Sequence, residues 1–532
     1  MTRISLALAA LVLTTACSAV RPTPAVGRPL AAVVPAPTLV VFLTVDQLRP
    51  DYFTRFGPQL TGGLKRLYDG GAVFTDAHHD HATAETAPGH ASVMSGRFPQ
   101  HTGIVRNNAG VGDPQAPLIG SSAAGASPFR FRGSVLTDWL RSKDPRTRAL
   151  SVARKDRGAI LPLGRAKQHV FWYGLNGRFT TSRYYADTLP TWVNAFNARR
   201  PLAQYAGREW TLLLPDSAYA EADSVPVESR GRDFTFPHWL TADTARAFGE
   251  VADFPWMDEQ TLALALAGLD ALALGRGPQT DVLAVSLSTT DAIGHRYGPD
   301  SREVHDQILR LDRALGTFLD SLYKVVDSTR VIVALTSDHG VTPFPQLHFP
   351  GTDPARGRAE VRPLLREYAQ RLQARGVDSS ALDFEYGLVS MDRAEFARAG
   401  VDADSTLRAF LADMRRVPGI LRADLRTSLA AQAAAGDKLA RRWVHALPSD
   451  LPVVAVVTIE PFHYWASSTS ATHGAPHDSD THVPVIFYGA PFRAGKYAGY
   501  VRTVDIAPTL AAVLQTLPTE PLDGVVLTRA IR

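Results

Sequence analysis

Five short apolar segments set the strongest limit on how this 532-residue chain can fold. Each is rich in valine and isoleucine, ends at turn-forming or charged residues, and shows little alternation between apolar and polar positions. They span residues 38–45, 281–288, 331–337, 452–460 and 483–489. Strands of this kind are buried on both faces, as in a parallel sheet that helices cover on both sides.

An amphipathic helix is predicted between two of these segments. Over residues 301–326, apolar side chains recur at steps of three or four and therefore share one helical face. A repeated strand, helix and strand imply an α/β fold, specifically a three-layer α/β/α sandwich with a largely parallel central sheet. Residues 110–275 and 350–450 are more irregular, so we expect them to be insertions in a catalytic domain that spans 38–532.

The first 37 residues differ from the rest of the chain. Residues 1–17 contain a basic residue, a short apolar run and small residues ending at Cys17, which predicts a signal peptide of bacterial lipoprotein type. Residues 18–37 are rich in proline and alanine and are expected to form an extended tether. We predict an exported protein, either periplasmic or anchored to the outer membrane through lipidated Cys17. The alternative is secretion with an incidental cysteine.

The charge balance argues against a polyanionic partner. The chain has 56 basic and 52 acidic residues, a net charge of +4 and no long run of Lys or Arg. Nucleic-acid binding needs a basic patch or stripe, so no nucleic-acid partner is expected. Cys17 is the only cysteine in the sequence, and an intramolecular disulfide is therefore excluded.

Acidic and histidine residues follow the apolar segments with unusual regularity. They are Asp46, Asp291, His295, Asp338, His339 and His473. Ligands bind at the carboxyl ends of parallel strands. A single aspartate there is more often a turn residue or a helix N-cap, but the joint occurrence favours a metal site. Three aspartates and three histidines suit a pair of zinc ions, although ligand type alone also fits manganese or another divalent metal.

Thr86 is the candidate nucleophile. The sequence TAPGHASVMSG, with Pro88 in the first turn, predicts a helix that begins at Thr86. A threonine hydroxyl becomes reactive when a metal ion or a helix N-terminus favours its alkoxide form. An isolated threonine at this position would more simply be an N-cap, but the predicted metal ligands favour the catalytic interpretation.

These motifs together resemble the alkaline phosphatase superfamily, and within it the type I phosphodiesterase/nucleotide pyrophosphatase branch. The resemblance covers residues 38 to about 515, including the whole stretch from Thr86 to Asn107. It implies one zinc bound by Asp46, Asp338 and His339, which activates Thr86. A second zinc, bound by Asp291, His295 and His473, would stabilise the leaving oxygen. His482 competes for the last position, but the THG sequence around His473 favours that residue.

The resemblance also implies which residues bind the phosphoryl group. Asn107 matches the asparagine that donates a hydrogen bond to a phosphoryl oxygen, although the NAGVGD sequence from residue 108 lacks the acidic-aromatic pair of many relatives. The KDRGAI sequence resembles PafA-like alkaline phosphatases, whose lysine and arginine bind phosphate; here these are Lys155 and Arg157. Two cations suit a monoester dianion. The alternative for this segment is a solvated charged turn.

The predicted function is therefore a zinc-dependent phosphate monoester hydrolase that acts through phosphothreonine on small-molecule phosphate esters. A phosphodiesterase or nucleotide pyrophosphatase with the same two-metal site is the main alternative. A phosphoryl transferase and a metal-binding protein without activity are further alternatives. The histidine-rich segment 78–81 is interpreted as a loop that leads to the nucleophile helix.

Overall fold

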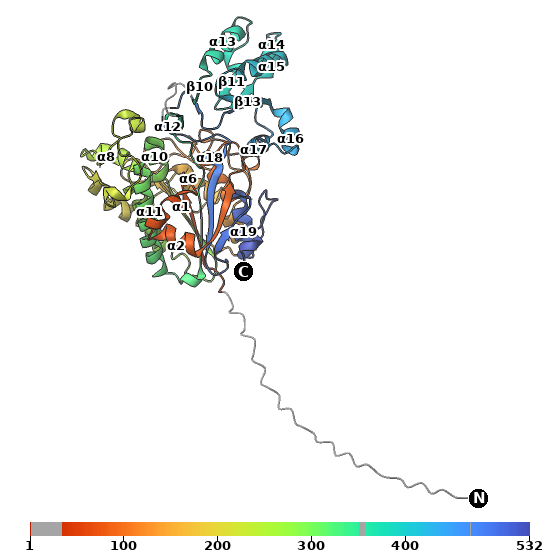
Figure 1. Cartoon of the computed structure of the whole chain (residues 1–532). Helices are drawn as coiled ribbons and strands as arrows, with labels where there is room; N and C mark the ends of the chain where they lie inside the picture. The colour runs from red at the N-terminus through yellow and green to blue at the C-terminus, as the bar shows by residue number, and fades with distance from the viewer. Residues whose placement is uncertain (2–34, 350–356, 469) are drawn as a thin grey trace. The chain divides into compact units, whose positions relative to one another are not determined.

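A mixed sheet forms the centre of the protein (Figure 1). The computed structural model describes Met1 and residues 35–349, 357–468 and 470–532, of which Pro35–Arg532 form one compact unit. The predicted signal peptide and most of the predicted tether lie outside the described residues. In spatial order, the strands are β17 (Gly495–Tyr497), β2 (Ala72–His78), β16 (His482–Tyr488), β9 (Val331–Thr336), β1 (Leu39–Val45), β8 (Asp281–Leu287), β3 (Ala149–Ala153), β4 (His169–Tyr173) and β5 (Phe179–Thr180), and β18 (Val501–Arg502) also pairs with β2.

Strand β1 lies in the middle of this sheet, parallel to β8 on one side and β9 on the other. All seven of its residues are buried. Leu39, Val41 and Leu43 belong to one hydrophobic cluster, whereas Val40 and Phe42 belong to a second cluster. Successive side chains of a strand point to opposite faces, so both faces of the sheet are covered. The predicted three-layer α/β/α sandwich is confirmed.

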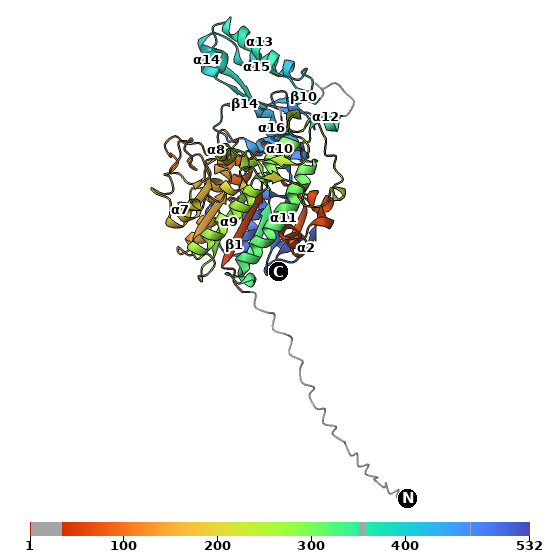
Figure 2. The ribbon, with the colours of Figure 1, turned by 90° about the vertical axis from the view of Figure 1, so that its left-hand side faces the viewer.

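Helices cover the two faces separately. The first face is covered by α2 (Gly63–Gly70), α9 (Trp256–Ala271) and α11 (Arg302–Tyr323), which lie near β1 in Figure 2, and the second by α3 (Thr86–Val93), α5 (Leu136–Lys143), α6 (Asp156–Ile160) and α19 (Ile506–Val513). The amphipathic helix predicted over 301–326 is confirmed as α11. Its N-cap is Ser301, whose hydroxyl accepts a hydrogen bond from the Val304 amide.

Two predicted core strands differ from expectation. The segment 483–489 forms β16, which lies in the central sheet but runs antiparallel to both neighbours, β2 and β9. The segment 452–460 forms β14 (Val453–Ile459), which belongs to a different sheet. Val456 packs in one hydrophobic cluster and Val457 in another, so β14 is also buried on both faces. An apolar sequence pattern can therefore predict a strand that is buried on both faces, but it cannot predict the sheet to which the strand belongs.

Residues 357–465 form what we call the cap. Its antiparallel sheet has the order β11 (Leu382–Glu385), β12 (Leu388–Met391), β14 and β13 (Ile420–Leu425). Its helices are α13 (Arg362–Gln373), α14 (Arg393–Arg398), α15 (Ala403–Met414), α16 (Arg426–Ala434) and α17 (Lys438–Ala446). The other predicted insertion, 110–275, contributes β3 and β4 to the central sheet, so it is not only a decoration of the core.

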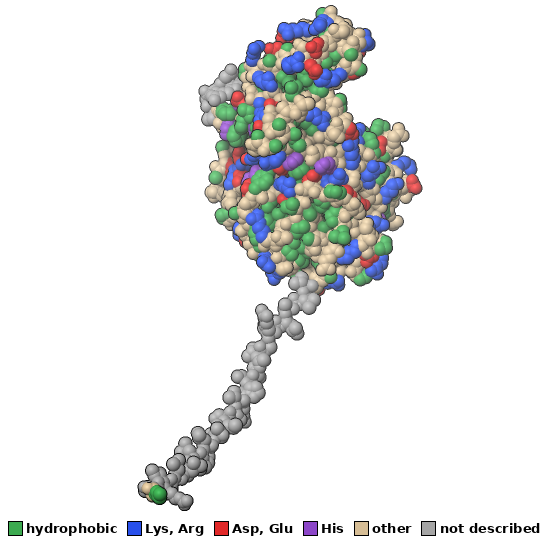
Figure 3. Space-filling view, turned by 90° about the vertical axis from the view of Figure 1, so that its right-hand side faces the viewer, with side chains coloured by type: hydrophobic (Ala, Val, Ile, Leu, Met, Phe, Trp, Pro, Cys, Tyr) green, Lys and Arg blue, Asp and Glu red, His purple; other side chains and the backbone are tan. Residues whose placement is uncertain are grey.

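The face drawn in Figure 3 shows Lys and Arg side chains scattered among acidic, polar and hydrophobic ones, over the cap as well as the core. No helix in the described part of the chain is both long enough and apolar enough to cross a bilayer.

Candidate active site

The predicted metal ligands come together where three adjacent parallel strands end. Asp46 follows β1, and its amide donates to Leu287 O of β8 at 2.9 Å. Asp338 and His339 follow β9, while Asp291 and His295 lie on α10 (Thr289–Tyr297), just after β8. Strands β8, β1 and β9 are neighbours in the sheet, so their carboxyl ends meet at one edge. Residues almost 300 positions apart in the sequence thus form one site.

Asp46, Asp338 and His339 form a triad that we call the buried triad. Their potential ligand atoms lie within 4.8 Å of one another, and all three side chains are fully buried. His339 Nε2 is 3.3 Å from Asp46 Oδ1 and 3.6 Å from Asp338 Oδ2. Among the described residues, Asp46 Oδ1 and Asp338 Oδ2 accept no hydrogen bond. Buried carboxylate oxygens without a donor are costly unless a cation is bound, so this triad fits a metal ion.

Asp291, His295 and His473 form a second group, the open triad, whose potential ligand atoms also lie within 4.8 Å of one another. The side chain of His295 is 33% exposed, whereas that of Asp291 is 4% exposed. His295 Nδ1 is 2.5 Å from Ala471 O, and His473 Nδ1 is 2.7 Å from Ala84 O. Donation from each Nδ1 leaves Nε2 as the coordinating nitrogen, the usual arrangement in metal sites.

Thr86 is the first residue of α3, as predicted. The N-cap is Glu85, which has extended backbone geometry, so Thr86 itself is not the capping residue. The Thr86 hydroxyl oxygen lies 3.5 Å from His339 Nε2 and 3.4 Å from Lys155 Nζ. The helix N-terminus adds a partial positive charge at the same place. The hydroxyl is therefore next to the buried triad in a setting that favours its anionic form.

Lys155 lies at the centre of the site. Its ammonium is 2.5 Å from Asp46 Oδ2 and 2.6 Å from Asp291 Oδ2, so it connects the two triads. Arg157 behaves differently, although it is only two residues away on α6. The only ion pair of its guanidinium within the described residues is with Asp156, at 3.5 Å. The structure thus brings Lys155, but not the Arg157 guanidinium, into contact with the predicted ligands.

Asn107 forms hydrogen bonds with the residues immediately before and after the candidate nucleophile. Its Oδ1 accepts a hydrogen bond from the Ala87 amide at 2.8 Å, and its own amide donates to Glu85 Oε2 at 2.8 Å. Within the described ranges, the Asn107 Nδ2 group donates to no protein atom. This amide is consequently oriented with its donor available for a ligand, as the predicted phosphate-binding role requires.

Strong electrostatic coupling accompanies this geometry. Burial by itself would lower the pKa of His339, but the charges of Asp338 and Asp46 outweigh burial and raise it to about 9. Burial opposes ionisation of Asp291, yet Lys155 and His295 hold its pKa well below the usual range. Burial, with the positive charges of His339 and His295, depresses the pKa of His473. Opposed shifts in one small volume are typical of functional sites.

The competing ligand His482 lies elsewhere. It is opposite His78 on the neighbouring strand and forms a third His/Asp group with His78 and Asp76. The imidazole rings of His78 and His482 are stacked, with centroids 4.7 Å apart and planes 15° apart. The lone pairs of two stacked rings cannot converge on one ion, because each lies in its own ring plane. This stacked arrangement is unfavourable for a metal centre, and it is His473, not His482, that lies with Asp291 and His295.

The family follows from comparison with known proteins. A sequence model described as type I phosphodiesterase/nucleotide pyrophosphatase matches residues 40–375. The chain belongs to this family. Alkaline phosphatase PhoK of a Sphingomonas species is 32% identical over 92% of this chain and 90% of PhoK. Alkaline phosphatase PhoV of Synechococcus elongatus is 30% identical over 93% of each chain.

A crystal structure of alkaline phosphatase PafA covers 94% of this chain and all of PafA, with a TM-score of 0.86 and 29% identity. The resemblance to PafA-like alkaline phosphatases within the type I phosphodiesterase/nucleotide pyrophosphatase family is therefore confirmed. The match to PafA extends beyond the family model, which ends at residue 375, and covers most of the cap.

Several residues at the site of this family member were not predicted from the sequence. Gln47 Nε2 donates to Asp291 Oδ1 at 3.0 Å, and its backbone has a left-handed φ of 65°. His90 Nδ1 lies 3.3 Å from Asp338 Oδ2 and 2.9 Å from Thr86 O. Gln47 directly follows Asp46 and His90 lies one helical turn after Thr86, so proximity to predicted residues was the available signal. Their carboxylate partners, Asp291 and Asp338, however, lie more than 240 residues away and become visible only in the fold.

Proposed function

We propose that this protein is an exported, zinc-dependent phosphate monoester hydrolase with Thr86 as its nucleophile. The observation that carries the proposal is the position of the Thr86 hydroxyl. It lies at a helix N-terminus, 3.5 Å from a ligand of the buried triad and 3.4 Å from Lys155, whose ammonium contacts both triads. Whole-chain similarity to proteins named alkaline phosphatase supports the same activity.

Zinc is the proposed metal because each triad offers histidine nitrogen together with carboxylate oxygen. Asp46, Asp338 and His339 would hold one ion, and Asp291, His295 and His473 the other. When bound, two such cations lower the pKa of a coordinated hydroxyl and neutralise charge on the attacking and leaving oxygens. The orphaned oxygens of Asp46 and Asp338 support the fit to a cation.

The chain's own residues account for the steps of the reaction. The Thr86 hydroxyl gives up its proton and its oxygen forms a bond to phosphorus, while the bond from phosphorus to the ester oxygen breaks and that oxygen takes up a proton from water and leaves as the alcohol. Water then attacks the phosphothreonine, the bond from phosphorus to Thr86 breaks, the Thr86 oxygen takes up a proton from that water, and free phosphate leaves. The Asn107 Nδ2 group donates to a phosphoryl oxygen, and its orientation is fixed by the Ala87 amide. The His90 imidazole contacts Ser286 Oγ and Thr86 O, and these two contacts hold it beside Asp338.

The preference for monoesters is assigned to Lys155. A monoester dianion carries one more negative oxygen than a diester, and a compact ammonium beside the nucleophile stabilises that charge. A solved PafA variant carries substitutions of a threonine, an asparagine, a lysine and an arginine, the four residue types proposed here as Thr86, Asn107, Lys155 and Arg157. Arg157, on α6, is proposed to add a second positive charge near the phosphoryl group.

Diester hydrolysis is the second candidate. The family model is described by phosphodiesterase and pyrophosphatase activities, and the Arg157 guanidinium pairs with Asp156 instead of contacting the site. Without the Arg157 guanidinium, fewer positive charges would face the phosphoryl group, and discrimination for the dianion would be weaker.

The test is kcat/KM of the zinc-loaded protein for p-nitrophenyl phosphate and bis-p-nitrophenyl phosphate. We expect the monoester to be preferred by orders of magnitude, and Lys155→Ala to reduce hydrolysis of the monoester much more than that of the diester. A diester preference, left unchanged by Lys155→Ala, would assign the protein to the phosphodiesterases instead.

Export and lipidation are proposed from the sequence of residues 1–17 and from Cys17. Fractionation of cells that express the chain with Cys17 or with Cys17→Ser tests this part. Loss of membrane association in the variant alone is the expected result.

A further inference from the structure

The tip of a cap hairpin contacts the loop that carries Asn107. Strands β11 and β12 are joined by Tyr386 and Gly387, and Tyr386 has a left-handed φ of 43° and is 53% exposed. Glu385, the last residue of β11, is the hairpin residue that contacts both neighbours of Asn107. None of the functional roles assigned above explains these contacts.

Glu385 binds the residues immediately before and after Asn107. Its Oε1 accepts a hydrogen bond from Asn108 Nδ2 at 2.6 Å. Arg106 Nη1 donates to Glu385 O at 2.9 Å and lies 3.1 Å from Glu385 Oε2. Glu385 therefore fixes both ends of the segment 106–108. Its contact with Arg106 is an ion pair, and its hydrogen bond with Asn108 is short.

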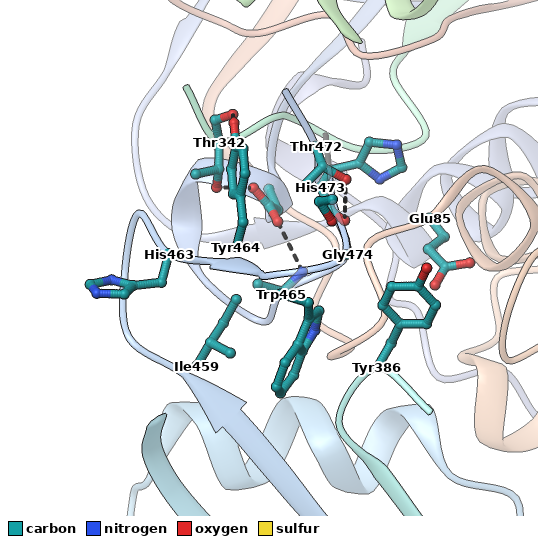
Figure 4. Close-up of a pocket in the computed structure, with 13 residues that line it drawn as sticks. Glu85, Thr342, Tyr386, Ile459, His463, Tyr464, Trp465, Thr472, His473 and Gly474 are labelled. Carbon is teal, nitrogen blue, oxygen red and sulfur yellow. Dashed lines mark hydrogen bonds between the residues drawn. The ribbon is translucent and has the colours of Figure 1, made fainter. Parts of the chain in front are cut away.

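Arg106 connects this hairpin to the residue before the nucleophile. Its guanidinium lies over the Tyr386 ring, 5.1 Å from the centroid, and its Nε is 3.8 Å from Glu85 Oε1. The Arg106 side chain is only 7% exposed, so it is enclosed between these groups. Figure 4 shows Tyr386 and Glu85 at the same end of a pocket that the cap and the His473 loop line together. Glu85 in turn accepts the Asn107 amide hydrogen bond.

We propose that Glu385 is a positioning residue for Asn107, so that the cap sets the geometry of phosphate binding although, in the described part of the chain, none of its side chains forms a hydrogen bond or ion pair with a candidate metal ligand. Glu385 fixes Arg106 and Asn108, Glu85 fixes the Asn107 amide from the other side, and the Asn107 Nδ2 group is thereby aimed at the phosphoryl group. This inference rests on the proposed function, because it assigns a device that serves the phosphate-binding role of Asn107.

The contacts of Glu385 indicate how much activity its removal should cost. Glu385 is partly exposed, with a 45% accessible side chain, so water can replace some of what is lost when it is removed. The hydrogen bonds that join Asn107 to the Ala87 amide and to the Glu85 carboxylate do not involve Glu385 and are expected to persist in the variant. We therefore expect Glu385→Ala to lower kcat/KM for a phosphate monoester about tenfold, which corresponds to the loss of roughly one well-placed hydrogen bond.

The experiment is a double-mutant cycle on the zinc-loaded, full-length protein. The four proteins are wild type, Glu385→Ala, Asn107→Ala and the double variant, each measured for kcat/KM with p-nitrophenyl phosphate and for inhibition by inorganic phosphate. Glu385→Gln, which keeps an acceptor for Asn108, is expected to retain most of the activity. Asp404→Ala serves as the matched control, since Asp404 is another exposed cap carboxylate, 56% accessible against 45% for Glu385, and pairs with Arg393 within the cap.

The cycle separates positioning from general stability. The expected result is about a tenfold loss for Glu385→Ala with weaker phosphate inhibition, no loss for Asp404→Ala, and no further loss when Glu385→Ala is added to Asn107→Ala. An equal loss in both backgrounds overturns the proposal, as does wild-type activity of Asn107→Ala. Both of those outcomes leave Thr86-dependent hydrolysis intact, whereas failure of the proposed function would appear as monoesterase activity that survives Thr86→Ala.

Discussion

The buried and open triads contain similar ligands but differ in their exposure to solvent. Asp46, Asp338 and His339 are all fully buried, whereas His295 of the open triad is one-third exposed. The buried triad also lies next to the Thr86 hydroxyl. The difference suggests a division of labour within one site. In the proposed mechanism, the enclosed triad would hold the nucleophile away from water, and the more exposed triad would lie on the side from which the alcohol leaves and water enters.

The largest expected difference between the triads comes from substituting one ligand in each of them. Asp338→Asn is expected to lower kcat/KM about 10⁴-fold, because it removes a charge from a fully enclosed site that also orders Thr86. His295→Ala in the open triad should cost about 10²-fold, because water can take the vacated position. Steady-state kinetics gives the loss of kcat/KM in each variant, and metal analysis gives its metal content. Equal losses of kcat/KM would show that the two triads are not functionally distinct.

Lys155 tests whether the two triads act as one unit. Lys155→Ala removes a cation that contacts a carboxylate from each triad, and we expect about a 10²-fold loss of kcat/KM for monoesters. Arg157→Ala, the neighbouring control, should cost less because its guanidinium pairs with Asp156. A larger loss for Arg157→Ala would mean that the residue moves into the site during catalysis.

The pH dependence of metal uptake tests the electrostatics of the buried triad. The carboxylates of Asp338 and Asp46 raise the pKa of His339 to about 9, so the metal-free buried triad binds a proton at neutral pH. A metal ion must displace that proton. Apparent affinity should therefore rise about tenfold per pH unit up to about pH 9 and then level off. Chelator competition at pH 7 and pH 8 measures this rise, and a pH-independent affinity would contradict it.

The smallest expected effect on catalysis comes from a cap contact that includes no residue of either triad. Asp80 is buried and pairs with Arg441 at 2.9 Å and with His445 at 3.4 Å, both on cap helix α17. Burial opposes ionisation of Asp80, but His445 and Arg441 outweigh it and lower its pKa. Asp80→Asn should destabilise the protein by about 3 kcal/mol with little change in kcat. Thermal unfolding measures the loss, and a large drop in kcat at full stability would show that the cap contact acts on the site.

The central sheet and the grouping of the candidate metal ligands could be predicted from the sequence for the same reason. Buried parallel strands are apolar throughout, and the residues that end them converge on one edge, so Asp46, Asp291 and Asp338 could be grouped without coordinates. The pattern could not show that β14 belongs to the cap, because the cap sheet is covered on both faces as well. Nor could it show that β16 runs antiparallel, since direction depends on connections rather than on side-chain pattern.

The residues that support the site were harder to predict from the sequence. Glu85, Arg106 and Glu385 are ordinary charged residues in their local segments, and each could have been a solvated surface side chain. Their role depends on contacts between the cap and the core, such as the 2.6 Å hydrogen bond from Asn108 to Glu385 across 277 positions. Lys155 and Arg157 were predicted as an equivalent pair, yet the orientation of α6 places only Lys155 between the triads.

The most direct test of the account is to trap the covalent intermediate. Zinc-loaded protein is mixed with excess p-nitrophenyl phosphate, quenched in acid within milliseconds, and its peptides are examined by mass spectrometry. We predict one phosphoryl group on the peptide that begins the α3 helix, located on Thr86 and missing in Thr86→Ala, which should also be inactive. Rapid hydrolysis with no phosphorylated Thr86 at any quench time, together with activity retained in Thr86→Ala, would contradict the assignment of Thr86 as nucleophile.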